Sequence, residues 1–142
     1  MVSLHGQRAY LDANTVIYAL EGLAQYSNLK VGLLDPLDDG AFTAVTSELT
    51  LVETIIGPRK AGKPTDEAEF RSFLTPSTNM VIAPISMAIL EKVIDIRAQH
   101  GIKIPDAIHL ATGIFANCTV FVTRDASWAK TGVTVVEPQD IV

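Results

Sequence analysis

The sequence predicts an α/β fold: a three-layer α/β/α sandwich with a parallel central sheet, formed as a single domain over residues 1–142. Short runs of strand-forming residues alternate with longer segments whose apolar residues recur at helical spacing. A helix between successive strands pairs those strands in parallel and covers both faces of the sheet. The chain has 142 residues, of which 48% are hydrophobic and 19% charged, which suits one compact domain with a real core.

The first third of the chain contains two strand candidates with helical segments between them. Arg8–Leu11 is a short strand, and Asn14–Leu20 has the apolar spacing of a helix. Leu29–Leu37 is a second, weaker helix that Pro36 disturbs, because proline lacks the backbone N–H that a helix interior uses. Phe42–Thr46 has the composition of a strand.

Two helices are expected next. Ser47 can cap a helix that ends near Gly57 and Pro58. The apolar residues of that helix are Leu49, Leu51, Val52, Ile55 and Ile56. Thr65 or Asp66 can cap the following helix.

The last part of the chain again alternates strands and helices. Met80–Ile85 is a buried-strand candidate, and Ser86 can cap a long helix after it. Pro105 suits the first position of another helix. Thr119–Thr123 and Val133–Val136 are the final strands. The apolar spacing predicts buried faces formed by Met87, Leu90, Val93 and Ile94 in the first of these helices, and by Ile108, Ala111, Ile114 and Phe115 in the second.

Four acids stand where predicted strands end or predicted helices begin. Asp12 directly follows the first strand, Glu48 follows the second, and Asp125 follows the next-to-last one. Asp106 lies in the first turn of a helix. In an open parallel sheet, sites form beyond the carboxyl ends of the strands. We therefore expect Asp12, Glu48 and Asp125 to gather at one edge of the sheet, with Asp106 pointing into the same cleft.

The chemistry of such a cluster favours a bound cation. Any one of these acids could simply cap a helix or face its dipole. Several carboxylates brought together, however, destabilise a fold unless a cation neutralises them. Carboxylates suit a hard cation such as Mg²⁺ or Mn²⁺. The single cysteine, Cys118, and three scattered histidines provide no zinc ligand set and no internal disulfide.

Four short motifs contain these acids, in an order and spacing that span almost the whole chain. They are Tyr10–Asn14 (YLDAN), Thr46–Leu49 (TSEL) followed by Glu53, Pro105–Thr112 (PDAIHLAT) and Phe121–Asp125 (FVTRD). Together they resemble the opening, second, third and last motifs of the PIN-domain family. The third motif is the most specific of the four.

The resemblance implies a metal-dependent ribonuclease, similar in length and motif style to VapC-type toxins. It implies that Asp12, Glu48, Asp106 and Asp125 are the catalytic and metal-binding residues, with Mg²⁺ or Mn²⁺ as cofactor. It also implies RNA as substrate, a homodimer, and a cognate antitoxin protein that silences the enzyme.

Other residues of these motifs have alternative interpretations. The resemblance implies that Asn14 and Thr123 support the acids, although Asn14 could equally cap the helix that follows. Glu53 is interpreted as a solvated or structural acid, because it does not closely share a helix face with Glu48, and a role in supporting the metal ligands is the lesser alternative. His109 shares a face with Asp106, and we expect a packed, hydrogen-bonded core histidine rather than a general base. Trp128 is expected to be a buried anchor rather than a base-stacking residue.

Basic residues close to the motifs are candidates for RNA contacts. Arg59, Lys60 and Lys63 lie close together and could hold RNA phosphates, or could form only a solvated loop. Arg124 is a further candidate. It stands where the family frequently has asparagine, which changes the hydrogen bonding expected in the last motif.

Charge and hydropathy restrict the remaining possibilities. The net charge of -5 does not indicate a broad basic surface for nucleic acid, unless the acids converge on bound cations. No apolar run approaches the length of a membrane span and the N-terminus lacks a signal-peptide core, so we expect a cytoplasmic protein without a membrane partner. Two alternatives remain: a PIN-fold protein that only binds partners, and a haloacid-dehalogenase-type phosphatase. The latter would need an aspartate where the chain has Asn14.

Overall fold

A computed structural model describes residues 1–142 and contains one five-stranded sheet in which every strand pair is parallel. The strands lie in the order β3-β2-β1-β4-β5. Their bounds are β1 Arg8–Leu11, β2 Thr43–Ser47, β3 Met80–Ala83, β4 Val120–Val122 and β5 Val135–Val136. An isolated bridge between Val2 and Ile141 brings the two ends of the chain together.

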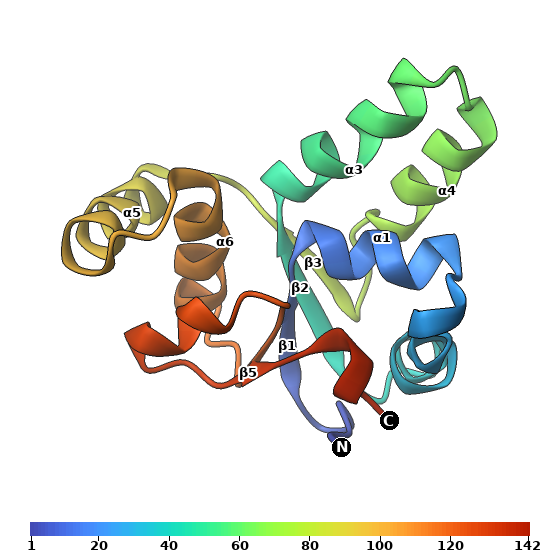
Figure 1. The fold of residues 1–142 in the computed structure, drawn as a ribbon, viewed down its shortest axis with the longest axis horizontal. Coiled ribbons are helices and arrows are strands. Elements are labelled where there is room, and N and C mark those ends of the chain that lie inside the picture. The colour runs from blue at the N-terminus through green and yellow to red at the C-terminus, as the bar shows by residue number, and fades with distance from the viewer.

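Helices cover both faces of the sheet, as predicted. Figure 1 shows the sheet nearly edge-on, with α5 and α6 on one side and α1, α3 and α4 on the other. The bounds are α1 Ala13–Glu21, α2 Asp35–Asp38, α3 Glu48–Lys60, α4 Pro64–Phe73, α5 Met87–His100 and α6 Ile104–Phe115. The antiparallel pair α3 and α4 projects from the body of the molecule (Figure 1). The three-layer sandwich predicted from the sequence is confirmed.

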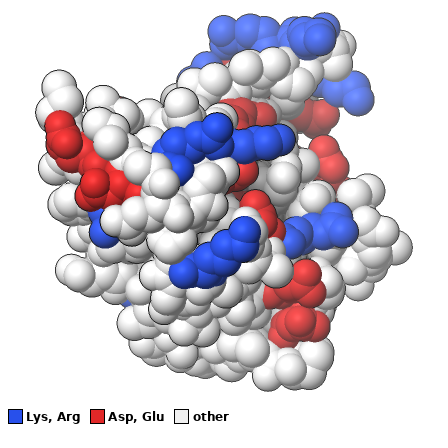
Figure 2. All heavy atoms as spheres, turned by 60° about the vertical axis from the view of Figure 1, so that its left-hand side comes forward, with Lys and Arg blue, Asp and Glu red and all other residues white.

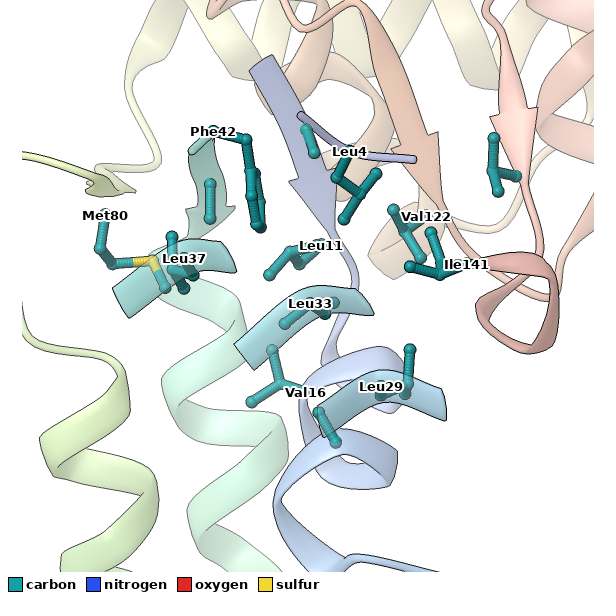
Figure 3. Close-up of a cluster of buried hydrophobic side chains, with 14 of the residues drawn as sticks. Leu4, Leu11, Val16, Leu29, Leu33, Leu37, Phe42, Met80, Val122 and Ile141 are labelled. Atoms are coloured by element: carbon teal, nitrogen blue, oxygen red, sulfur yellow. The ribbon is translucent and has the colours of Figure 1, made fainter. Parts of the chain in front are cut away.

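The alternation of side chains along the strands produces two separate cores. Ala9 and Leu11 face the α1 side of the sheet, whereas Tyr10 between them faces α5 and α6. In β4, Val122 and Phe121 divide in the same way. Figure 3 shows the core on the α1 side, in which leucines from the α1 to α2 region meet strand residues from β1 and β4.

Several helix ends differ from the predicted ones. The helix expected to stop near Gly57 and Pro58 continues to Lys60, because a proline in the last turn removes only one backbone hydrogen bond. The next helix begins at Pro64, so neither Thr65 nor Asp66 caps it. A π-turn over Lys30–Leu34 lies directly before α2, and Pro36 is within α2. The predicted disturbance of this segment is therefore confirmed.

Other ends are shifted by a few residues. The helix predicted over Asn14–Leu20 is capped by Asp12 rather than by Asn14. Pro105 is the second residue of α6, not the first. The predicted strand Met80–Ile85 ends at Ala83, directly before a proline, which cannot donate a ladder hydrogen bond.

The buried faces predicted for the last two long helices were partly wrong. In α5 the buried residues are Ile89, Val93 and Ile96, while Met87 and Ile94 are 73% and 60% exposed. In α6 the buried side includes Leu110 and Ala111, but Phe115 is 51% exposed and the sheet-facing face also holds polar residues. Both helices carry apolar residues on more than one face, so spacing alone selects neither face.

None of the helices in this fold has both the length and the apolar character that spanning a bilayer requires.

Candidate active site

Strand order places two of the predicted acids side by side. β1 lies next to β4, and the chain continues from β1 to β2 on one side and from β4 to β5 on the other. This is the point at which the direction of strand addition reverses, where open parallel sheets form their binding crevice. Asp12 directly follows β1, and Asp125 lies shortly after β4. Asp106, in the first turn of α6, lines the same hollow as both.

Asp12 is held in place by two hydrogen bonds, one to each oxygen of its carboxylate. Its carboxylate caps α1, with Oδ1 accepting from the backbone N–H of Thr15 at 2.8 Å. Its Oδ2 accepts from the Thr123 hydroxyl at 2.6 Å. Asp12 is only 8% exposed and Thr123 only 1%, so little water competes for these bonds. The supporting role expected of Thr123 thus has a defined geometry.

Asp125 is fixed by the turn that follows β4. Its carboxylate Oδ1 accepts from the backbone N–H of Ser127 at 3.0 Å and from the Ser127 hydroxyl at 2.5 Å. Its own N–H donates to the Thr123 hydroxyl oxygen at 3.1 Å. Thr123 therefore links Asp12 and Asp125, and both carboxylates are oriented before any ligand binds.

The pKa of Asp106 is affected by burial and by the neighbouring acids. Burial raises the pKa of the Asp106 carboxyl above its ordinary value, and the negative charges of Asp125, Glu53 and Asp12 raise it further. His109 acts in the opposite direction. The ionised form of Asp106 is thus disfavoured by neighbouring carboxylates, which is the situation that a bound cation relieves.

Glu48 does not join the three aspartates. Its carboxylate accepts a 2.9 Å hydrogen bond from the backbone N–H of Ile85, beyond the end of β3, and it does not line the aspartate hollow. Its exposed position above β2 places it toward the β3 side of the sheet. Glu53, five residues further along α3, is the glutamate whose charge reaches Asp106. The expectation that Glu48 gathers with the aspartates is therefore corrected.

Glu53 is connected to the core by a histidine and a tyrosine. The Nε2 of His109 lies 2.5 Å from Oε1 of Glu53, and its Nδ1 lies 2.6 Å from the hydroxyl of Tyr10. His109 is 3% exposed, which confirms the expectation of a packed, hydrogen-bonded histidine. Trp128 is 1% exposed and stacks against the His109 ring, so it is the buried anchor predicted and cannot stack on a base.

Asn14 also lines the hollow, but it is exposed and makes no hydrogen bond to Asp12. Neither of the two roles expected for it, capping α1 or orienting Asp12, is present.

The basic candidates divide into two groups. Arg124 lines the aspartate hollow, and a hydrogen bond to Tyr18 raises its pKa above the ordinary value. Arg59 is paired with Glu67 at 2.7 Å, whereas Lys60 is exposed and Lys63 lines a groove between α1, α3 and α4. Figure 2 shows acidic atoms in recesses between basic side chains on one face. This face therefore exposes positively charged side chains despite the net negative charge of the chain.

The donor set fits a hard divalent cation. The hollow is lined only by polar or charged residues, and three of them are carboxylates: Asp12, Asp106 and Asp125. No group of three or more acidic, histidine or cysteine side chains is arranged to hold an ion by itself, so further ligands would have to come from water or substrate. Mg²⁺ characteristically keeps several waters and binds through one or two carboxylates together with substrate phosphates, so an open set of this kind suits it.

Comparison with known proteins assigns the pattern to a family. The PIN domain family model matches residues 9–133, which is most of the chain. No curated protein sequence matches it.

Solved structures with this fold come from several bacteria. The toxin-antitoxin complex from Klebsiella pneumoniae superposes with a TM-score of 0.70 at 26% identity, covering 92% of this chain and 97% of that one. VapBC2 from Rickettsia felis, bound to a promoter DNA fragment, gives 0.69 at 18% identity and covers 91% and 97%. VapC20 from Mycobacterium tuberculosis, a sarcin-ricin loop cleaving toxin, gives 0.68 at 14% identity and covers 89% and 96%.

Proposed function

Because this chain belongs to the PIN domain family, we propose that it is a metal-dependent endoribonuclease, a hydrolase of RNA phosphodiester bonds. The observation that carries the proposal is the convergence of Asp12, Asp106 and Asp125 on one polar hollow at the switch point of the sheet. The Mycobacterium tuberculosis relative with the same fold is described as a toxin that cleaves the sarcin-ricin loop, which supports RNA as the substrate class.

The three aspartates are the proposed ligands for Mg²⁺ or Mn²⁺, and Glu53 replaces Glu48 as the fourth acid. When bound, the cation lowers the pKa of a water and neutralises charge that develops on the phosphate. The chain's own contribution is orientation. Thr123 and the N-terminus of α1 hold the Asp12 carboxylate, and Ser127 holds that of Asp125. Because these carboxylates are already held in place, they would bind a cation without further rearrangement.

Arg124, at the rim of the hollow, is proposed to attract the RNA backbone. Lys60 and Lys63, on the projecting α3–α4 pair, could extend that contact along the strand. Replacing Arg59, Lys60 and Lys63 with alanine should weaken RNA binding and flatten its dependence on salt, since fewer counterions are released. An unchanged salt slope would return these three residues to a purely solvated role.

The central test is cleavage of total cellular RNA, with mapping of the new ends, in the presence of Mg²⁺, Mn²⁺ or a chelator. Asp12→Asn and Asp106→Asn should abolish cleavage that the wild-type protein shows with cation. Asp95→Asn is the matched control, since Asp95 is an exposed acid on α5 outside the hollow. If the wild-type protein cleaves no RNA with either cation, a non-catalytic binding role replaces this proposal.

The choice between the two glutamates has its own matched pair. Glu53→Gln should lower the cleavage rate strongly, because it removes a carboxylate whose charge reaches Asp106. Glu48→Gln should leave the cleavage rate close to wild type, because the Glu48 carboxylate accepts a hydrogen bond from the backbone N–H of Ile85. The reverse ranking would restore the original assignment of Glu48.

The protein is further proposed to be the toxin of a toxin-antitoxin pair. A groove between α1, α3 and α4 is lined by the apolar Ile17, Leu20 and Phe70 together with acidic residues: Glu21, Glu53, Asp66 and Glu69. On α3, Val52 and Ile56 are 51% and 56% exposed. An amphipathic partner helix would fit such a groove, and a basic side chain on it could reach toward the acids.

Expression in a bacterial host tests this role. The wild-type protein should slow growth, Asp12→Asn should relieve the effect, and co-purification with its genomic neighbours should yield a small inhibitory partner. A harmless protein that cleaves RNA freely and captures no partner would contradict the toxin role while leaving the nuclease intact.

A homodimer is proposed through the exposed apolar residues of α5, where Ile94→Lys should shift the mass measured by light scattering toward the monomer.

A further inference from the structure

A chain of polar groups runs from the core on the α5–α6 side to Glu53, which lines the groove between α1, α3 and α4 and whose charge reaches Asp106. It contains Tyr10 from β1, His109 from α6 and Glu53 from α3, joined by contacts of 2.6 Å and 2.5 Å. Tyr10 is fully buried and His109 is 3% exposed, while the side chain of Glu53 is 35% exposed. Three separate elements therefore meet at one histidine ring.

The direction of these hydrogen bonds follows from the chemistry of the tyrosine. A tyrosine phenol carries its proton at neutral pH and can therefore donate it to a ring nitrogen. With the Tyr10 hydroxyl donating to Nδ1 of His109, the ring carries its proton on Nε2. That Nε2–H then donates to the carboxylate of Glu53.

The ring itself has little freedom to turn. Trp128 stacks against His109 with an interplanar angle of 20°, and the Tyr10 ring meets it edge-on at 63°. Because both ring nitrogens have partners, His109 has no free nitrogen with which to accept a proton from a substrate. The contact from His109 involves only Oε1 of Glu53, so Oε2 of the carboxylate remains available to other groups.

We propose that His109 and Tyr10 are positioning residues that hold the Glu53 carboxylate in a fixed orientation toward the aspartate hollow. This inference rests on the proposed function, in which Glu53 is the fourth acid. Groups that orient metal-binding carboxylates and fix histidine tautomers typically change metal affinity or activity by ~10–100-fold when mutated. A buried leucine would fill the space of His109 equally well, but it would leave the carboxylate without a donor.

The first experiment measures the tautomer directly and needs no substrate. Nitrogen-15 NMR of the metal-free wild-type protein should show one buried histidine with its proton on Nε2 and an accepting Nδ1. In Tyr10→Phe, the Nδ1 resonance should lose the signature of an accepted hydrogen bond, while the exposed His5 is unchanged. A wild-type ring protonated on Nδ1 would overturn the proposal.

The second experiment separates positioning from simple packing. His109→Leu should weaken Mn²⁺ binding, measured by calorimetry, and lower kcat by ~10–100-fold with little change in KM. His109→Gln keeps an amide donor and should recover part of the loss. Ile89→Val, a buried change elsewhere in the same core, is the control for general loosening.

A double-mutant cycle gives the decisive outcome. In a Glu53→Gln background, His109→Leu should cause no further loss of Mn²⁺ affinity, because its only effect passes through that carboxylate. An equal loss in both backgrounds would show that His109 acts only through the fold. If His109→Leu does not fold, the same cycle is performed with Tyr10→Phe. A wild-type protein that binds Mn²⁺ but cleaves no RNA would contradict the nuclease role, and the double-mutant cycle could still be measured because it reports Mn²⁺ affinity.

Discussion

Gly113 lies where α6 approaches β4 most closely, and its replacement by alanine would disturb both stability and the site. A Cβ at this position would lie 2.7 Å from Cζ of Phe121 and 2.2 Å from its Cε2, and the shorter distance is more than 1 Å below ordinary contact at 3.4 Å. Phe121 is 2% exposed and packs against Tyr10 and Trp128, so its ring cannot turn away freely. The helix must therefore move away from the sheet.

Two opposing terms decide the size of the effect. Alanine in place of a helical glycine gains about 1 kcal/mol of helix propensity. Forcing extra volume into a packed core costs roughly 1–3 kcal/mol, and a clash this short belongs at the upper end. The net expectation is a loss of about 2 kcal/mol. For 142 residues, with an unfolding entropy of about 2 cal/mol/K per residue, this corresponds to a fall in Tm of about 7 °C.

Calorimetry or urea unfolding of Gly113→Ala measures this value, and Gly57→Ala is the matched control. Gly57 lies inside α3, directly before Pro58, and a Cβ there would meet no atom within 4 Å apart from its chain neighbours. Strain against the proline ring offsets its gain in helix propensity, so the control should change stability much less. Since α6 carries Asp106, Gly113→Ala should also lower nuclease activity at temperatures where the protein is fully folded. A Gly113→Ala protein as stable as Gly57→Ala would refute the close approach of α6 and β4.

Three further changes have defined outcomes. Thr123→Val removes the buried 2.6 Å hydrogen bond to the Asp12 carboxylate and should cost ~1.5–3 kcal/mol in urea unfolding, whereas Thr123→Ser should cost less. Without cation at pH 7, Asp106→Asn should be at least as stable as wild type, because burial and Asp125 disfavour the charge of the Asp106 carboxylate. Mn²⁺ should raise the Tm of this variant less than that of wild type, and an equal rise would contradict the role of Asp106 as a ligand. Hydrogen bonds from Arg59 and Arg71 lower the pKa of Glu67 to about 2. This interaction stabilises the fold above the ordinary carboxyl pKa of 4.5 and is lost as pH falls toward 2, so the small destabilisation by Glu67→Gln should disappear in acid unfolding curves over that range.

The order and type of the main elements followed from apolar spacing, but their buried faces followed less well. Ser86 caps α5 as predicted, since a serine before an apolar helical run has few other uses. The buried stripe of α5 is Ile89, Val93 and Ile96, and the predicted stripe with Met87 and Ile94 has the same spacing. Two apolar stripes on one helix are equivalent in the sequence, and only the packing of α5 against α6 distinguishes them.

Three of the four acids could be located from the sequence because each lies directly at the end of an element. Asp12 and Asp125 follow neighbouring strands, and Asp106 lies in the first turn of α6, so small errors in element bounds do not separate them. These aspartates lie close together because β1 and β4 are adjacent in the sheet. The chain continues from β1 and from β4 toward opposite edges of the sheet, and open parallel sheets form a crevice at such a point.

Which of the two glutamates, Glu48 or Glu53, lies near Asp106 depends on the order of the strands in the sheet, which the local sequence does not determine. β2 pairs with β3 on one edge and with β1 on the other, and Glu48, at the first turn above β2, turns toward the β3 side, where Ile85 donates to it. Glu53 lies five residues on, about 7.5 Å further along the helix and about 140° around it. That rotation brings it to His109 on α6, and α6 also carries Asp106. The proposed fourth acid is thus identified by its contact with α6, the helix that faces α3, and not by proximity to the end of a strand.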